Sequence, residues 1–312
     1  MAAERPPTID PVAAARWEGA APVASPWLHE EVGRRMQERL SWIKLQPDAW
    51  ADWAPLAGGL AAHDLVARRY QNSKCFVVET LEQRSLVATK LIAKPWWTAA
   101  RLRAGATRIE EPPPGSVQML WANMALHLCA DPGALITRWH RALATSGFLM
   151  FSCLGPDTAR ELRDLYTALG WGPAGHAFTD MHDWGDMLLQ AGFAEPVMDM
   201  ERITLTYATP ARLLAELREI GRNLHPARHP SLRGRRWRAR LEDELRERLA
   251  DPAQEGRLAL SVEIIYGHAF KAAPRLPVAE RSAIGLDAMR EMLKVTPKVS
   301  AERDPPHDDR QR

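Results

Sequence analysis

Two side chains that could take part in a reaction follow a short apolar run near the middle of the chain. Asn123 and His127 come just after Val117–Trp121, which we expect to be a buried strand. An imidazole can carry a proton or bind a ligand near neutral pH. His127 also fits the edge of a hydrophobic core, where it would cap or pack without touching a ligand, and both interpretations stay open.

Two arginines farther along the chain are candidates for holding an anion. Arg160 and Arg163 belong to the predicted helix that follows the apolar run Phe148–Cys153. A guanidinium can bind a carboxylate through two parallel hydrogen bonds, which also fixes the orientation of the carboxylate. The alternative is that both arginines are solvated helix residues.

The remaining reactive side chains match no recognised catalytic or metal-binding pattern. His176, His182 and Asp183 lie within eight residues, which is not the spacing of a known metal site. The sequence shows neither a Ser/His/Asp pattern nor a pair of catalytic carboxylates. Its three cysteines are far apart in apolar surroundings: Cys75, Cys129 and Cys153. We therefore expect no metal ion and no disulfide framework.

The elements that would position these residues centre on one apolar run and the turn after it. Phe148–Cys153 is typical of a strand buried on both faces, and Gly155-Pro156 then breaks the chain. Either Pro156 lies in the first turn of the next helix, or Thr158 caps that helix, since Thr158 and Glu161 have capping-box spacing. Open α/β sheets bind ligands at such a junction, although an ordinary strand-to-helix joint is the other interpretation.

Strands alternate with helices along most of the chain, which predicts an α/β fold with a doubly wound, mostly parallel sheet and an antiparallel edge. Residues 209–257 break the alternation and are interpreted as a helical insertion. The predicted parts of the chain are an N-terminal extension (1–26), an α/β core (27–208), the insertion (209–257), the last strand and end of the core (258–300), and a disordered charged tail (301–312).

Composition limits the class of protein further. The chain has 312 residues, of which 46% are hydrophobic and 26% charged, enough for a sizeable core. Its net charge of +2 argues against a general nucleic-acid binder. The N-terminus lacks a signal-peptide pattern and no apolar run approaches the ~20 residues that span a bilayer. We expect a cytoplasmic protein that binds neither membrane nor nucleic acid.

Several segments share a pattern with one known family. The two most specific are LGPDTARELR and HAFTDMHDWGDMLLQAGFAEPVMDMERITLTY, at residues 154–163 and 176–207. The others are WANMALHL (121–128), RALATSGFLMFS (141–152), HEEVGRRMQERLSWIKLQP (29–47) and, more loosely, IIYGHAFK (264–271). On these segments the chain resembles the class I S-adenosylmethionine-dependent methyltransferases, and more narrowly the malonyl-acyl carrier protein O-methyltransferases of biotin synthesis. The resemblance implies a Rossmann-like fold and S-adenosylmethionine as cofactor.

The cofactor motif of that family is only partly present. The family has an acidic residue followed by three glycines at alternate positions, where the backbone wraps closely around the cofactor. In this sequence Asp52 and Gly58 keep their places, while Ala54 and Leu56 replace two glycines. Pro55 between them removes a backbone donor. Ala54, Pro55 and Leu56 therefore weaken the expectation that the cofactor binds.

Glu79 stands where the family has an acidic residue that holds both ribose hydroxyls, although a solvated glutamate at a strand end is the other interpretation. Three more family contacts are altered. The adenine-binding aspartate falls within Ala104–Ala106, the aspartate that opens strand four reads as Gln118, and the N-terminal Tyr-Asp pair falls near Pro22-Val23. The cofactor contacts that the resemblance implies are those of Asp52, Gly58, Glu79 and Asn123.

The reaction implied by the resemblance is methylation of the free carboxyl of a malonyl group. A carboxylate is already ionised at neutral pH, so the enzyme mainly positions the reactants and excludes water. His127, Arg160 and Arg163 are the predicted substrate-binding residues. The alternative function is a catalytically inactive member of the fold that acts as a binding or assembly factor.

A run of arginines in the predicted insertion could recruit a partner. An acidic acyl carrier protein would be attracted to such a basic face. The alternative is that the arginines pair with acidic residues on the same helix, among them Glu242, Glu244 and Glu247. The run consists of Arg228, Arg233, Arg235, Arg236, Arg238 and Arg240.

Overall fold

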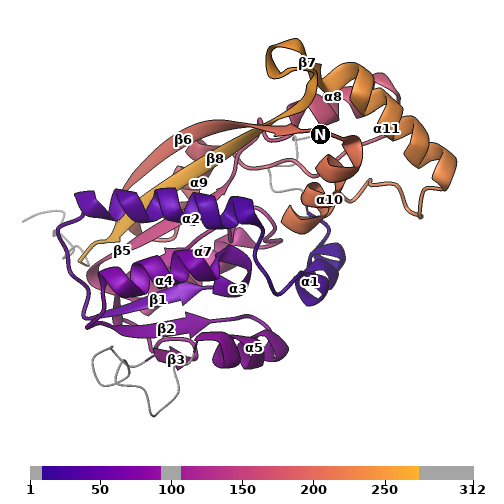
Figure 1. The fold of residues 1–312 in the computed structure, drawn as a ribbon. Coiled ribbons are helices and arrows are strands. Elements are labelled where there is room, and N and C mark those ends of the chain that lie inside the picture. The colour runs from indigo at the N-terminus through magenta and orange to yellow at the C-terminus, as the bar shows by residue number, and fades with distance from the viewer. Residues whose placement is uncertain (1–8, 93–106, 274–312) are drawn as a thin grey trace, which may run out of the picture. The chain divides into compact units, whose positions relative to one another are not determined.

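The computed structural model describes residues 9–92 and 107–273 of the chain, and these residues build one mixed sheet. The strand order is β3-β2-β1-β4-β5-β8-β6, with β7 paired to β8 (Figure 1). Strands β1 to β5 pair in parallel, whereas β8 runs antiparallel to β5 and to β6. The strands are β1 (Ala49–Trp53), β2 (Lys74–Val78), β3 (Thr107–Ile109), β4 (Val117–Ala122), β5 (Leu143–Leu154), β6 (Phe193–Tyr207), β7 (Ala250–Asp251) and β8 (Arg257–Lys271). The predicted doubly wound, mostly parallel sheet with an antiparallel edge is confirmed.

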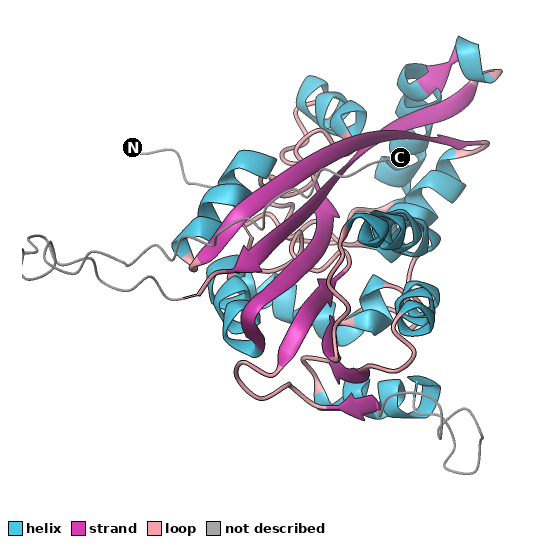
Figure 2. Ribbon diagram, turned by 90° about the vertical axis from the view of Figure 1, so that its left-hand side faces the viewer, coloured by secondary structure: helices cyan, strands magenta, loops and turns pink. Residues whose placement is uncertain are grey.

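Helices cover both faces of this sheet (Figure 2). One apolar core cluster joins the sheet to α2, α4, α5, α8, α10 and α11, and a second joins its opposite face to α7 and α9. The helices are α1 (Pro11–Ala20), α2 (Trp27–Arg39), α3 (Pro55–Gly58), α4 (Leu60–Arg69), α5 (Glu82–Ile92), α7 (Pro132–Ala142), α8 (Arg160–Ala168), α9 (Met181–Gln190), α10 (Pro210–Ile220) and α11 (Arg235–Leu249). None of the helices in the described residues combines the length and the apolar composition that a membrane span requires.

The alternation of side chains along the strands explains why both faces are apolar. In β4, Met119 and Trp121 belong to one core cluster, while Leu120 and Ala122 belong to the other. A strand in the middle of a parallel sheet is buried on both faces, so it reads as a continuous apolar run. This is why the central strands could be recognised in the sequence.

The junction after β5 differs from the prediction. Helix α8 begins at Arg160, after Ala159 in a left-handed conformation, and neither Pro156 nor Thr158 starts it. The Thr158 hydroxyl exchanges hydrogen bonds with the backbone of Glu263 on β8, at 3.0 and 3.1 Å. Glu161 accepts hydrogen bonds from the amide and hydroxyl of Ser261 on β8. The capping-box prediction was therefore wrong, because both side chains bind the neighbouring strand.

The strand before this junction is longer than predicted. Strand β5 begins at Leu143, five residues before the predicted start at Phe148. Helices α10 and α11 fall between β6 and β8, in the stretch interpreted as an insertion. The predicted tail (301–312), residues 274–300 and the segment Ala104–Ala106 lie outside the described residues.

Candidate functional site

The carboxyl ends of β1 and β2 bring together the residues predicted to contact the cofactor. Asp52, at the end of β1, is buried, and its Oδ2 lies 2.7 Å from Nδ1 of His63 on α4. Burial raises the pKa of Asp52, and the hydrogen bond from His63 opposes this shift. The carboxylate of Asp52 is therefore engaged within the protein.

The loop after β1 is tightly folded. Ala54 adopts the left-handed conformation with φ of 57°, which a glycine would accept more readily. The short helix α3 follows, and the side chain of Leu56 is fully buried in it. A Cβ added to Gly58 would lie 2.6 Å from the backbone oxygen of Asn123, so only glycine fits there.

Glu79, just after β2, closes this loop from the other side. Its carboxylate accepts a hydrogen bond from the backbone amide of Leu56 at 2.9 Å and pairs with Nε of Arg84 at 3.2 Å. Its side chain is only 1% exposed, and burial raises its pKa while Leu56 and Arg84 lower it. Arg84 in turn donates to the carbonyl of Ala21, which lies just after α1. Both oxygens of Glu79 are thus held by the chain itself.

Asn123, just after β4, connects three segments. Its amide nitrogen donates to the carbonyl of His29 at 2.7 Å and to that of Gly58, while its oxygen accepts from the Ser152 hydroxyl at 2.6 Å. The residue is buried. Asn123 therefore ties α2, the loop after β1 and β5 together.

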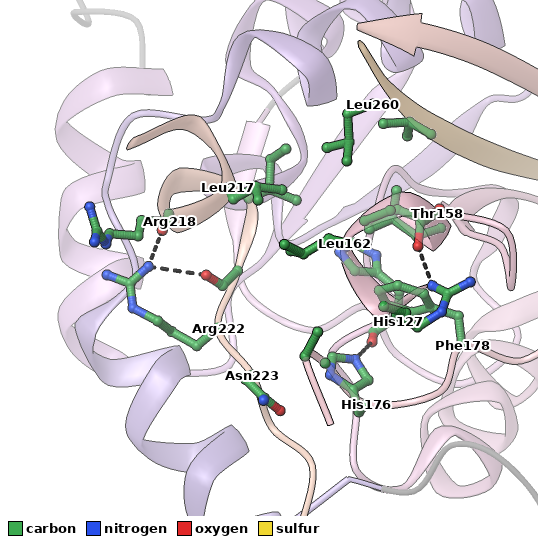
Figure 3. A pocket seen from close by; sticks show the side chains of 18 of the residues that line it. His127, Thr158, Leu162, His176, Phe178, Leu217, Arg218, Arg222, Asn223 and Leu260 are labelled. Atoms are coloured by element: carbon green, nitrogen blue, oxygen red, sulfur yellow. Dashed lines mark hydrogen bonds between the residues drawn. The ribbon is translucent and has the colours of Figure 1, made fainter. Parts of the chain in front are cut away.

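A cavity of about 350 Å³ lies beside these residues, at the carboxyl ends of β4 and β5 (Figure 3). Its walls are mostly apolar and come from α2, α8, α10, β6 and β8. Among the described residues that line it, the charged ones are three arginines: Arg163, Arg218 and Arg222. The apolar lining includes Leu28, Leu154, Leu162, Leu205, Leu214, Leu217, Ile220, Leu260 and Val262. Such a cavity suits an apolar chain that ends in an anion.

His127 and His176 line this cavity, and a third buried histidine, His29, lies next to His127. The His127 residue is 3% exposed, and neither ring nitrogen has a hydrogen-bond partner within the described part of the chain. Burial, together with His29 and His176, holds its pKa well below its usual range, so the ring is neutral. Its ring centroid lies 5.9 Å from that of His29 and 6.2 Å from that of Phe178. A neutral imidazole offers one donor and one acceptor.

The two neighbouring histidines have defined tautomers. Nδ1 of His29 lies 2.7 Å from the carbonyl oxygen of Ala57, and Nε2 of His176 lies 2.9 Å from that of His127, so each of these nitrogens carries the hydrogen. Burial lowers the pKa of His29 to about 4 and also lowers that of His176. Unlike His176, His182 is exposed, so the histidines that drew attention in the sequence lie in different surroundings.

The two predicted substrate arginines lie in different places. Arg163 lines the cavity, and its guanidinium donates to the carbonyls of Pro156 (2.5 Å) and Thr158. Arg160 does not line it and lies 3.5 Å from Glu161. Arg218 and Arg222 also line the cavity and were not predicted, because their position beside it depends on how α10 packs.

Comparison with known proteins identifies the family. No family model matches the sequence. The chain is 39% identical over 260 residues to the malonyl-acyl carrier protein O-methyltransferase of Gallionella capsiferriformans, covering 81% of this chain and 87% of the relative. The enzyme of the same name from Laribacter hongkongensis is 36% identical, with 80% and 84% covered. This chain belongs to the malonyl-acyl carrier protein O-methyltransferase family.

The solved structures agree on the fold. A Bacillus halodurans protein classed as a methyltransferase superposes with a TM-score of 0.52 at 14% identity, over 78% of this chain and all of that protein. The YcgJ protein of Bacillus subtilis superposes with a TM-score of 0.50 at 12% identity, over 77% and 99%. The chain therefore has the fold of the class I methyltransferases.

In the loop after β1, the side chains that the resemblance assigns to the cofactor contact the chain's own groups. Leu56 buries an isobutyl group where the family has glycine, and the carboxylate of Glu79 is bound by Leu56 and Arg84. A ribose would have to compete with both partners for Glu79. The cavity is therefore open, whereas both carboxylate oxygens of Glu79 are bound by the chain's own groups.

Proposed function

We propose that this chain is an S-adenosylmethionine-dependent O-methyltransferase that methylates the free carboxyl of malonyl-acyl carrier protein, an early step of biotin synthesis. The relatives that carry this name support the proposal, since they are matched over more than four fifths of their length. The structural observation that carries it is the apolar cavity, whose charged lining residues within the described ranges are all arginines. An apolar cavity with cationic groups suits an acyl group that ends in a carboxylate.

The residues around the cavity would position the acceptor. A malonyl carboxylate is ionised at neutral pH and needs no base to become a nucleophile. The N–H of His127 can donate to one of its oxygens, and Arg163 supplies a positive charge that is fixed by two backbone carbonyls. The surrounding leucines exclude water, which strengthens both interactions. When bound, S-adenosylmethionine supplies an activated methyl group.

Binding of the cofactor would require Glu79 to give up Leu56 and Arg84. When the binding-competent state is only a fraction of the population, the apparent affinity falls by that fraction. We therefore expect weaker binding of S-adenosylmethionine than at a preformed site.

The partner we propose is the acyl carrier protein, attracted by the basic face of α11. Arg238 and Arg240 pair with acidic residues one turn away, at 2.9 and 3.8 Å, as in the alternative interpretation of the run. Arg235 and Arg236 are exposed, and within the described residues neither forms an ion pair. These two arginines would meet an acidic partner directly.

The test is incubation of the purified chain with malonyl-acyl carrier protein and S-adenosylmethionine that carries a radioactive methyl group. We expect label on the malonyl carrier, in an ester that alkali releases, and none on an acetyl carrier, which lacks a free carboxyl. Equal labelling of both carriers would contradict a carboxyl acceptor.

The closed loop after β1 favours a second candidate function, which is recognition of the malonyl carrier without methyl transfer. The labelling assay distinguishes this second function from the first. The carrier would bind the chain, but no label would reach it even after long incubation.

A further inference from the structure

Helix α1 bridges the two sides of the candidate site (Figure 1). At its start, the carboxylate of Asp10 pairs with Arg228 at 2.7 Å, and the amide of Asp10 donates to the carbonyl of Leu224 at 2.9 Å. Both partners lie in the loop after α10, which also lines the cavity. In the last turn of α1, Glu18 accepts a hydrogen bond from the hydroxyl of Thr80, which follows β2. Helix α1 therefore joins the cavity side to the side of the predicted cofactor residues.

Helix α1 is held mainly by contacts at the surface. None of its ten residues, all of which the structure describes, is buried. The guanidinium carbon of Arg222 lies over the ring of Trp17, 4.9 Å from its centroid. Elements with few buried apolar contacts open at a lower free energy than the core does. Helix α1 can therefore detach while the sheet stays folded.

The residues after α1 hold Arg84, the partner of Glu79. The carbonyl of Ala21 accepts a hydrogen bond from Nη1 of Arg84 at 3.3 Å, while Nε of the same guanidinium lies 3.2 Å from Oε2 of Glu79. The side chains of Arg84 and Glu79 are 10% and 1% exposed, so this ion pair is shielded from water. Residues 22–24, between Ala21 and α2, are exposed, so the chain can bend there.

The burial of Arg84 and Glu79 decides how firmly they hold one another. Separating two charges that are shielded from water is costly, because each is left buried without its partner. An ion pair that is exposed to water contributes little. Nη2 of Arg84 is buried and has no partner within the described residues, so contact with water would favour this guanidinium. Detachment of the segment at Ala21 would therefore loosen Arg84 from Glu79.

We propose that α1 and residues 21–26 form an autoinhibitory strap at the predicted cofactor site. With the strap closed, as in this structure, Arg84 occupies Oε2 of Glu79. When the strap opens, Arg84 is solvated and releases this oxygen, which can then accept a ribose hydroxyl. The proposal rests on the proposed function, because it takes S-adenosylmethionine as the ligand of the site.

The test is calorimetric titration of the full chain with S-adenosylhomocysteine, which keeps the ribose but lacks the methyl group that is transferred. The double variant D10A/W17A removes the N-cap of α1, the ion pair with Arg228 and the contact with Arg222. We expect it to bind at least about tenfold more tightly than the unmodified chain, which corresponds to an open state of about a tenth of the population or less. The matched control is D180A, which removes the same kind of N-cap from α9 and should leave the affinity unchanged.

Hydrogen exchange of the α1 amides distinguishes a strap that must open from a lid that closes on the cofactor. In the unmodified chain, saturating S-adenosylhomocysteine should speed exchange at residues 14–20 at least about threefold, because the bound state keeps the strap open. Slower or unchanged exchange at these residues would overturn the proposal. This readout requires no variant and no methyl transfer.

Equal affinity in the unmodified chain and in D10A/W17A would overturn the strap while leaving cofactor binding, and with it the proposed reaction, in place. A gain of the same size in D180A would also overturn it, as would no binding by either protein at millimolar concentration. The labelling assay decides the proposed reaction separately, so the failure of the strap and the failure of the reaction are distinguishable.

Discussion

The imidazoles of His127 and His176 line the cavity, that of His29 lies next to His127, and burial lowers the pKa of all three. Each is neutral at pH 7, so each can donate one hydrogen bond and accept another. The same burial makes the folded state sensitive to acid. Below about pH 6.5 the unfolded chain binds protons at these rings while the folded chain does not, so the unfolding free energy falls as the pH decreases.

His29 allows a test of this effect. Its pKa of about 4 in the folded chain, against its usual value of 6.5, corresponds to roughly 2 kcal/mol of stability lost between pH 7 and pH 5. In His29→Asn the amide can still donate to the carbonyl of Ala57, but it does not titrate. Urea unfolding at the two pH values should therefore show a loss smaller by roughly 2 kcal/mol than in the unmodified chain. An unchanged loss would show that His29 does not carry the effect.

The contribution of the Asn123 amide to stability can be tested by substitution, because this amide donates to two carbonyls. In Asn123→Asp the oxygen that replaces the amide nitrogen would face the carbonyls of His29 and Gly58 without a hydrogen to donate. We expect a loss of roughly 2–4 kcal/mol in urea unfolding at pH 7. The control Ser152→Ala removes only the hydroxyl that bonds Asn123 and Met124 and should cost less. Equal costs would contradict the role of the amide.

The positions of the predicted cofactor residues could be read from the sequence, but their partners could not. Glu79 lies at the end of β2 as expected, because a short strand and the residue after it form a local pattern. Its bonds to Leu56 and Arg84 join three segments, and no local pattern encodes such contacts. Similarly, the sequence gives no reason to distinguish Arg160 from Arg163. Only the packing of α8 places Arg163 at the cavity and Arg160 outside it.

The start of α8 shows how tertiary contacts override a local signal. Thr158 and Glu161 have the spacing of a capping box, yet both side chains bind β8. Strand β8 belongs to the antiparallel edge and lies about a hundred residues further along the chain. The sequence could place α8 and β8, but not their hydrogen bonds to one another.

Thr158→Val tests the importance of this connection. The substitution keeps the shape of the side chain but removes the bonds to the amide and carbonyl of Glu263. We expect a loss of about 1–3 kcal/mol in urea unfolding. Thr167→Val, on the exposed side of the same helix, should cost less than about 0.5 kcal/mol. If both variants lost the same stability, the bonds to β8 would not be what holds α8.

At the scale of the whole described chain, the strand order and the two apolar faces follow from alternating strands and helices, which the sequence made visible. The cavity could not be predicted from this alternation. Its walls combine α2, α8, α10, β6 and β8, so it exists only once α10 packs beside the sheet.

Charge reversal on α11 tests whether its basic face binds acyl carrier protein. The double variant R235E/R236E should weaken binding of acyl carrier protein at least tenfold at low salt, because it replaces two attractive charges by repulsive ones. The difference should shrink as salt screens the charges. The control R68E/R69E reverses two adjacent exposed arginines on α4, which lies apart from α11 in Figure 1, and should bind almost unchanged. Equal weakening in both pairs would contradict a docking site on α11.

The decisive measurement is transfer of a radioactive methyl group from S-adenosylmethionine to malonyl-acyl carrier protein, compared between the unmodified chain and Leu56→Gly. Glycine removes the isobutyl group that fills the loop after β1, so the cofactor should bind with less rearrangement. We expect slow labelling by the unmodified chain and labelling at least about tenfold faster by a folded Leu56→Gly variant. Binding of the carrier by both proteins with no label from either would contradict methyl transfer and leave a protein that recognises the carrier alone.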